Sequence, residues 1–234
     1  MDSQIEAFWL GHSAFKLTSP NETNILVDPF LSQNGTTPEE WKKPENIDHI
    51  LLTHGHEDHV GDTVEIANRT GCTVTCIVEL AGLLNKKGVS DDQTVGFNKG
   101  GTVEYDDFNV TLTSANHSSS FGGEYAGDPG GLVIHFENDI TLYHLGDTNI
   151  FADLELYGQL YDPDICFVPM GDHFTMGPEE AAHATGLIDP GYAVPIHYGT
   201  FPVLTGKPED FQSDVEQICD TEVLIPEAGE NFIQ

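Results

Sequence analysis

Residues 50–63 read ILLTHGHEDHVGDT, and the hexapeptide HGHEDH at 54–59 decides how the rest of the chain is interpreted. An apolar run at 49–53 predicts a strand that leads directly into this polar loop. Imidazole nitrogens together with a carboxylate oxygen suit a borderline cation such as Zn²⁺. Because His54, His56, Asp58 and His59 cannot easily all reach one ion from such a short loop, we expect two ions.

Three later residues stand at the ends of predicted strands in the same way. His117 follows the strand expected at 108–116, Asp147 ends the run 140–147, and His197 lies at the end of the run 193–198. Each of them alone would be interpreted as structural. Their joint appearance after a dense His/Asp loop indicates one shared cluster.

The other elements come from the spacing of apolar residues and from turn residues between the runs. Further strands are expected at 5–10, 14–18, 24–28, 72–78, 93–98, 101–105, 131–137, 164–170 and 221–225. Helices are expected at 60–71, 78–88, 151–160, 178–188 and 208–218. This order indicates an α/β fold with two sheets packed face to face and helices outside. No linker separates the parts, so we expect a single domain, 1–234, with two similar halves at roughly 1–115 and 116–234.

The charge balance is strongly acidic. The chain has 39 Asp and Glu against 8 Lys and Arg, which gives a formal net charge of −31. Such a surface repels itself unless counter-ions screen it, and this favours a halophilic protein that works in concentrated salt. The acidity also disfavours nucleic acid as a partner in ordinary salt.

Location and cysteine use are ordinary by comparison. No apolar run approaches the roughly 20 residues that a membrane helix needs, and the first residues do not resemble a secretion signal. We therefore expect a cytoplasmic protein with no membrane partner. The four cysteines, Cys72, Cys76, Cys166 and Cys219, form no CxxC pair and are expected to be free thiols.

Several segments together resemble the metallo-β-lactamase superfamily, with HxHxDH followed by single His, Asp and His residues. Within it, the chain resembles the predicted metal-dependent hydrolases close to L-ascorbate-6-phosphate lactonase. The segments that carry this are GHSAF (11–15), LVDPF (26–30), ILLTHGHEDHVGDT (50–63), HSSSF (117–121), YHLGDT (143–148), PMGDHFTMGPEEAA (169–182) and PIHYGTFP (195–202). The resemblance implies an αβ/βα four-layer sandwich.

The resemblance also implies a division of the metal ligands. His54, His56 and His117 would bind the first ion, Asp58, His59 and His197 the second, and Asp147 would bridge both. Two such ions can share a water, lower its pKa and present hydroxide to a substrate. Zn²⁺ is the default metal, and Mn²⁺ or Fe²⁺ also occupies nitrogen and oxygen sites of this kind.

Residues around the ions have less specific signals. Asp58 is expected to orient the hydroxide or to pass a proton to the leaving group, as well as to bind metal. We expect His12 to contact the substrate or transfer a proton, and His173, just before a predicted helix, to act at the site. For Asp28, a carboxylate that holds the far nitrogen of a ligand histidine and a simple turn cap are equally good interpretations.

The leading hypothesis is a dinuclear hydrolase that acts on a small ester, lactone or phosphoester. A phosphodiesterase or nuclease of the same fold is one alternative, and a metal-dependent metabolite-binding protein without turnover is the other. The partner expected is a small-molecule substrate. Relatives of this kind often associate, which favours a homo-oligomer.

Overall fold

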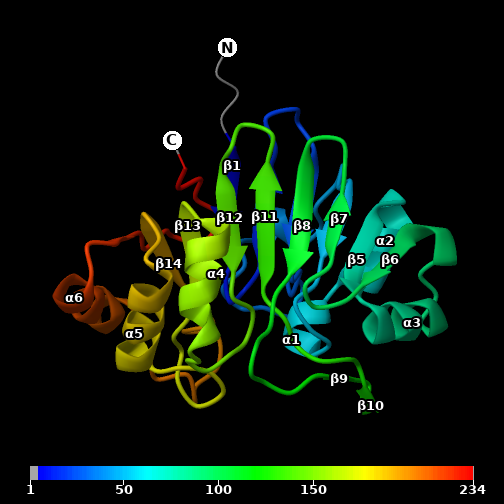
Figure 1. Ribbon diagram of the computed structural model, residues 1–234. Helices are drawn as coiled ribbons and strands as arrows, with labels where there is room; N and C mark the ends of the chain where they lie inside the picture. The colour runs from blue at the N-terminus through cyan, green and yellow to red at the C-terminus, as the bar shows by residue number, and fades with distance from the viewer. Residues whose placement is uncertain (1–4, 234) are drawn as a thin grey trace.

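The computed structural model describes residues 5–233, in which two large mixed sheets lie face to face between helices (Figure 1). The first sheet takes its strands in chain order. They are β1 (Glu6–Trp9), β2 (Phe15–Thr18), β3 (Asn24–Val27), β4 (His49–Leu51), β5 (Thr73–Ile77) and β6 (Thr94–Phe97). The β1–β2–β3 part is antiparallel and the β3–β4–β5–β6 part is parallel.

The second sheet has the order β15-β14-β13-β12-β11-β8-β7. Its strands are β7 (Thr102–Glu104), β8 (Phe108–Leu112), β11 (Leu132–Phe136), β12 (Thr141–His144), β13 (Ile165–Pro169), β14 (Tyr192–Ile196) and β15 (Glu222–Val223). A small separate hairpin, β9 (Ser120–Phe121) with β10 (Glu124–Tyr125), projects from the loop between β8 and β11.

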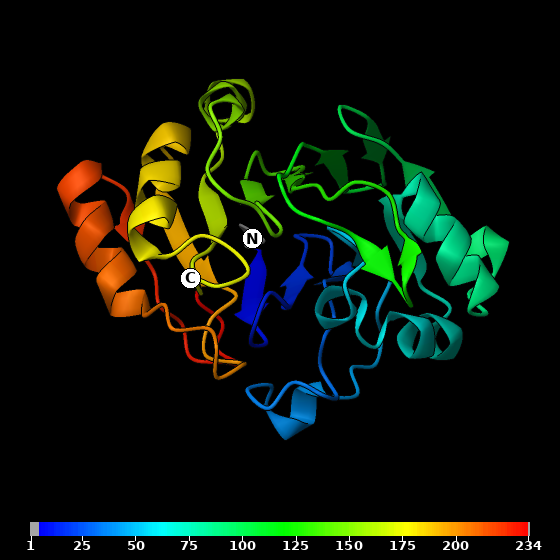
Figure 2. The same ribbon diagram turned by 90° about the horizontal axis from the view of Figure 1, so that it is seen from below.

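Helices cover the outer flanks of the two sheets. On one flank are α4 (Asp153–Tyr161), α5 (Pro178–Ile188) and α6 (Pro208–Ile218), and on the other are α2 (Thr63–Thr70) and α3 (Val78–Lys86), as Figures 1 and 2 show. Three short helices complete the set: α1 (Glu57–Val60), η1 (Glu39–Trp41) and η2 (Asp91–Gln93). Both α5 and α6 begin with proline, whose fixed φ suits the first helical position.

Strand β13 shows how the second sheet packs against the first sheet on one face and against the helices on the other. Its Phe167 lies in the core between the sheets, whereas the neighbouring Cys166 and Val168 lie in the second core, under α4 to α6. Because side chains alternate across a strand, a strand covered on both faces is apolar throughout. Phe167 stacks on Phe15 of the first sheet with ring centroids 4.1 Å apart. Truncating a ring buried in this way costs about 3–5 kcal/mol.

The α/β four-layer architecture expected from the sequence is confirmed, and all five expected helices are present. The strand expected at 108–116 ends at Leu112. Strands β7 and β8 precede residue 115 but belong to the second sheet, where β8 pairs with β11 and β7 with β8, so the boundary between the sheets lies before β7 in the sequence. The single domain with two halves stays a prediction. No helix among residues 5–233 is long and apolar enough to cross a membrane.

Chain segments from both sheets leave their strands at one common edge, where α1 lies at the lower end of Figure 1. Three residues just beyond strand ends have left-handed backbones: His12 at φ 55°, Asp28 at φ 45° and His197 at φ 60°. This conformation costs energy for a residue with a side chain and tends to persist where function requires it. All three side chains belong to the site described next.

Candidate metal centre

The candidate ligands lie at the ends of strands from both sheets, on the side from which Figure 2 is viewed. The first sheet supplies His12 after β1 and the hexapeptide after β4. The second supplies His117 after β8, Asp147 after β12 and His197 after β14. Gly55 keeps the hexapeptide close to its surroundings, since a Cβ there would lie 2.3 Å from Cβ of Ala126.

The site divides into two groups of possible ligand atoms, each with its members within 4.8 Å of one another. One group is His54, His56, His117 and Asp147. The other is His12, Asp58, His59 and His197. All seven residues proposed as metal ligands are thus brought together, and His12 joins the second group.

Asp147 lies between the groups and is only 2% exposed. Its Oδ1 is 3.3 Å from Nε2 of His59 in the second group. Its Oδ2 is 3.1 Å from Nε2 of His197, 3.5 Å from Nε2 of His117 and 3.9 Å from Nε2 of His54. A single carboxylate therefore faces imidazoles of both groups.

Several of these buried atoms lack a hydrogen bond within the described part of the chain. They are Nε2 of His59, Oδ1 of Asp147 and both ring nitrogens of His197. Buried polar atoms are normally satisfied, so unpartnered donors and acceptors gathered at one point need another partner. Imidazole nitrogens and carboxylate oxygens are ligands for borderline divalent cations. The residues present fit a pair of such ions.

The electrostatics of the cluster also favour positive charge. Burial by itself would raise the pKa of Asp147, but His197 and His59 outweigh it and hold that pKa well below its usual value. Burial would likewise lower the pKa of His59, yet Asp147 and Asp28 hold it well above the ordinary value. Divalent cations would supply the positive charge that these carboxylates attract.

Asp28 fixes the orientation of two histidines. Its Oδ2 accepts a hydrogen bond from Nδ1 of His59 at 2.7 Å, which leaves Nε2 of that ring bare toward Asp147. The Thr53 hydroxyl donates to the same oxygen at 2.6 Å and accepts from Nδ1 of His54 at 3.0 Å. Holding the far nitrogen of a ligand histidine is the common way to set its tautomer. Of the two interpretations left open for Asp28, the structure shows this one.

His12 is completely buried beside Asp58. Its Nε2 donates to Oδ2 of Asp58 at 3.2 Å, and its Nδ1 accepts from the hydroxyl of Thr200 at 3.0 Å. Burial, together with the neighbouring His197, lowers the pKa of His12 to about 4, so the ring is neutral near pH 7. Burial opposes ionisation of Asp58, but the bond from His12 and the nearby His59 hold its pKa below the usual value.

The segment just before β9 holds the hexapeptide in place. The hydroxyl of Ser119 accepts a hydrogen bond from the backbone N–H of Gly55 at 3.1 Å, and the hydroxyl of Ser118 lies 3.4 Å from Nε2 of His56. Sequence reasoning assigned no role to these serines, and it missed Thr53 and Thr200 altogether. A hydroxyl side chain carries no signal in the sequence until its partner, as far away as 188 positions for Thr200, is known.

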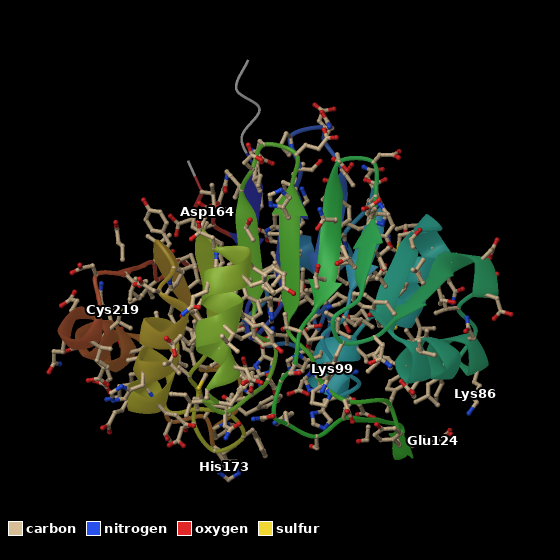
Figure 3. The ribbon with its side chains drawn as sticks, in the orientation of Figure 1. Lys86, Lys99, Glu124, Asp164, His173 and Cys219 are labelled. Atoms are coloured by element: carbon tan, nitrogen blue, oxygen red, sulfur yellow. The ribbon has the colours of Figure 1, made fainter. Side chains whose placement is uncertain are left out.

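His173 is not brought into either group. It lies exposed in the loop before α5, at the lower edge of Figure 3, with its ring against Phe174. Both Asp172 and His173 have left-handed backbones, at φ 66° and 62°. No contact recorded for the described residues joins His173 to the ligands, so its expected catalytic role has no geometric support and stays a prediction.

A cavity of about 570 Å³ adjoins the second group and includes Asp58 in its wall. Its other walls come from the chain after β3, from α1 and the turn after it, from β9 and from the chain after β14. The loops 32–46 and 118–131 contribute Ser32, Gln33 and Phe121. A cavity of this size, beside a cluster of polar ligands, is suited to a small molecule.

Comparison with known proteins agrees with this geometry. Residues 23–198 match the model of the beta-lactamase superfamily domain. A UPF0173 metal-dependent hydrolase of Koribacter versatilis is 44% identical over 231 residues, covering 97% of this chain and 98% of the relative. One from Methanosarcina mazei is 44% identical over 236 residues, covering 98% and 99%. Igni18, described as a novel metallo hydrolase from Ignicoccus hospitalis, has a solved structure with a TM-score of 0.88, 35% identity and 98% coverage of both chains.

The paired sheets and the two His/Asp groups define a metallo-β-lactamase-fold enzyme, as the resemblance implied. Within that superfamily, the chain belongs to the UPF0173 family of metal-dependent hydrolases.

Proposed function

We propose that the chain is a dinuclear hydrolase of a small ester, lactone or phosphoester, with one divalent ion in each His/Asp group. The observation that carries this is the position of Asp147, whose carboxylate faces His59 and His197 of one group and His117 and His54 of the other. In this proposal Asp147 would help to hold both ions. His54, His56 and His117 would hold the first, and Asp58, His59 and His197 would hold the second.

Two bound cations would supply an activated water as nucleophile and a positive charge that stabilises the developing negative charge on a substrate oxygen. The chain's own residues do the rest. Asp58 lies in the wall of the cavity, and its Oδ2 is held by the Nε2–H of His12. Asp58 is therefore placed to take the proton that the attacking water gives up and to deliver it to the leaving oxygen. His12, neutral and buried, is a positioning residue for Asp58.

The donor set supports Zn²⁺ as the first metal to test, with Mn²⁺ and Fe²⁺ next. We propose a small-molecule partner and not a nucleic acid, because the formal charge of −31 opposes a polyanion. A homo-oligomer, a cytoplasmic location and a salt-rich working medium are further proposals.

Metal content per chain is the direct test. The protein would be purified in molar KCl without chelator, as wild type and as the His56→Ala, Asp147→Ala and His183→Ala variants. His183 lies exposed on α5 outside both groups, which makes it the matched control for a lost imidazole. We expect about two ions per wild-type and control chain, with loss of metal and of ester cleavage in the other two.

Two results would contradict the proposal. One is a full complement of metal in the Asp147→Ala variant together with unchanged turnover, since that result would show that Asp147 does not hold the two ions. The other is wild-type protein that remains folded but takes up no metal when it is offered, which would leave a metabolite-binding protein.

A further inference from the structure

The cavity beside Asp58 has aromatic walls. Phe30 follows β3 and Phe201 follows β14, and their ring centroids are 6.3 Å apart. Both rings also meet His12 edge-on, at 5.9 and 5.5 Å. The third ring, Phe121, comes from the β9–β10 hairpin. Three half-buried phenyl groups from distant parts of the chain therefore converge on one space next to the proposed metal pair.

The charged residues of the cavity wall are all acidic. They are Glu57, Asp58 and Asp62. The Asp62 oxygens accept hydrogen bonds from the backbone N–H groups of Leu31 and Ser32 and from the Ser32 hydroxyl, which hold this carboxylate in the wall. Among the described residues that line the cavity, none is a lysine or an arginine.

The cations nearest to this hairpin are engaged elsewhere. Lys86 pairs with Glu124 at 3.2 Å and Lys99 with Asp128 at 3.6 Å, and Figure 3 labels Lys86, Lys99 and Glu124. Lys87 has its Nζ 5.7 Å from the centroid of the Phe121 ring but is not part of the cavity wall. Asp58 is itself a proposed ligand of the second ion, so a negatively charged group beside Glu57 and Asp62 would meet two carboxylates without a lining cation to offset them.

This reasoning rests on the proposed function and narrows its substrate class. We propose that the part of the substrate that does not react, its arm, is an apolar, ring-sized group without negative charge, held among Phe30, Phe121 and Phe201. Rings gain from edge and face contacts beyond the area that they bury. A phosphorylated arm would lose its hydration and meet the carboxylates instead, so sugar-phosphate lactones and similar metabolites are excluded as substrates.

The test compares arms whose 4-substituents are neutral, positive or negative, with the two charged groups similar in size. The probes are phenylacetic acids with a methyl, a trimethylammonio or a sulfonate group at the 4-position, and the methyl ester of each acid. Calorimetry on the Zn²⁺-loaded protein gives the affinity of the three acids, and kcat/KM gives cleavage of the three esters. We expect the methyl arm to bind at least about tenfold more tightly than the sulfonate arm, and the trimethylammonio arm to bind no more weakly than the sulfonate arm.

Matched variants assign the effect to residues. Phe201→Ala should weaken binding of the acid with the methyl arm about fivefold or more. Leu156→Ala, which truncates an exposed apolar residue on α4, should leave that affinity unchanged. Glu57→Gln should reduce the ratio of the affinities for the methyl and sulfonate arms, the gap between them, by about threefold. Glu155→Gln, likewise in the first turn of a helix but outside the cavity, should leave the gap unchanged.

The outcomes separate this inference from the proposed function. A sulfonate arm that binds as tightly as the methyl arm overturns the inference, and weaker binding of that sulfonate arm in Lys87→Gln would then show that this lysine anchors the anion. Either of these two results would leave the proposed hydrolysis of the esters unaffected. If metal and acids bind but no ester is cleaved, the proposed function fails, and the order of the three affinities still decides which arm the cavity accepts.

Discussion

Nδ1 of His59 donates to Asp28 across 2.7 Å, and this one bond determines which nitrogen of the ring faces Asp147. Because Thr53 links the same carboxylate to His54, Asp28 orients one histidine of each proposed metal group. Asp28 is fully buried and its left-handed backbone, at φ 45°, turns the side chain toward the cluster.

Replacing Asp28 by asparagine should therefore weaken the binding of both proposed ions without unfolding the protein. Oδ2 accepts from both the Thr53 hydroxyl and His59, and Oδ1 accepts the backbone N–H of Thr53, so an amide NH2 group on either side must face one of these donors. We expect metal affinity to fall about 10- to 100-fold, measured by competition with a chelator of known affinity. Asp164→Asn is the control, since Asp164 accepts the backbone N–H of Thr141 at the opposite end of the sheets (Figure 3). Equal loss in both variants would contradict the assignment.

His144 should make stability depend on pH. Its Nε2 donates to the carbonyl of Ser13 and its Nδ1 accepts from the N–H of Gly146, so the ring is neutral and joins the two sheets. Burial lowers its pKa below the ordinary value. The unfolded chain then binds more protons, so this contribution is present above about pH 6.5 and is lost as the pH falls below it.

The check is the free energy of unfolding between pH 8 and pH 5 at constant KCl, for wild type and for His144→Gln. The variant starts less stable because it loses a buried hydrogen-bonded link. Its free energy of unfolding should then fall less on acidification, because it lacks the ionisation of His144. Parallel curves for the two proteins would show that His144 does not contribute to the pH dependence.

Salt should raise the melting temperature. The formal charge is −31, and the lysine–carboxylate pairs recorded within residues 5–233 are only Lys42–Glu39, Lys86–Glu124 and Lys99–Asp128. Self-repulsion is therefore little relieved by the chain itself. Between 0.2 and 2 M KCl we expect a rise of about 10 °C or more as the charges are screened. Sucrose at matched osmolality controls for general solute exclusion, and an equal rise in sucrose would refute screening as the cause.

The four thiols should differ in reactivity. Cys72, Cys76 and Cys166 are buried, and burial raises the pKa of each, whereas Cys219 is partly exposed at the end of α6 (Figure 3). A thiol reagent such as Ellman's reagent should label Cys219 rapidly in the native protein. The other three should react only after denaturation. Rapid labelling that persists in Cys219→Ser would indicate that a buried strand opens.

The candidate metal ligands could be located from sequence because histidine and aspartate at strand ends are unusual residue types in an unusual place. His117, Asp147 and His197 are examples, and the structure brings them together with the hexapeptide. The hydroxyls of Thr53, Thr200 and Ser119 could not be located in this way. Threonine and serine occur in every loop, and only the folded chain shows which of them meet a ring nitrogen or a backbone N–H.

For the fold, too, part could be predicted from the sequence and part could not. Apolar alternation predicts that 101–105 and 108–116 are strands, but it does not say which sheet they join, and β7 and β8 extend the second sheet beyond β11. The four-residue helix α1 was missed because its residues, Glu57–Val60, are dominated by the ligand pattern. Its geometry nevertheless brings His59 inward, to a completely buried position.

Each His/Asp group takes residues from both sheets: His59 and His197 in one group, His54 and His117 in the other. An ion held by either group is consequently a cross-link between the two layers of the sandwich. Opening the sandwich would require release of the ions, and a ligand that binds only the closed form stabilises it by an amount that rises with the logarithm of the free ligand concentration. The supply of metal would then set how long the folded protein survives as well as how fast it works.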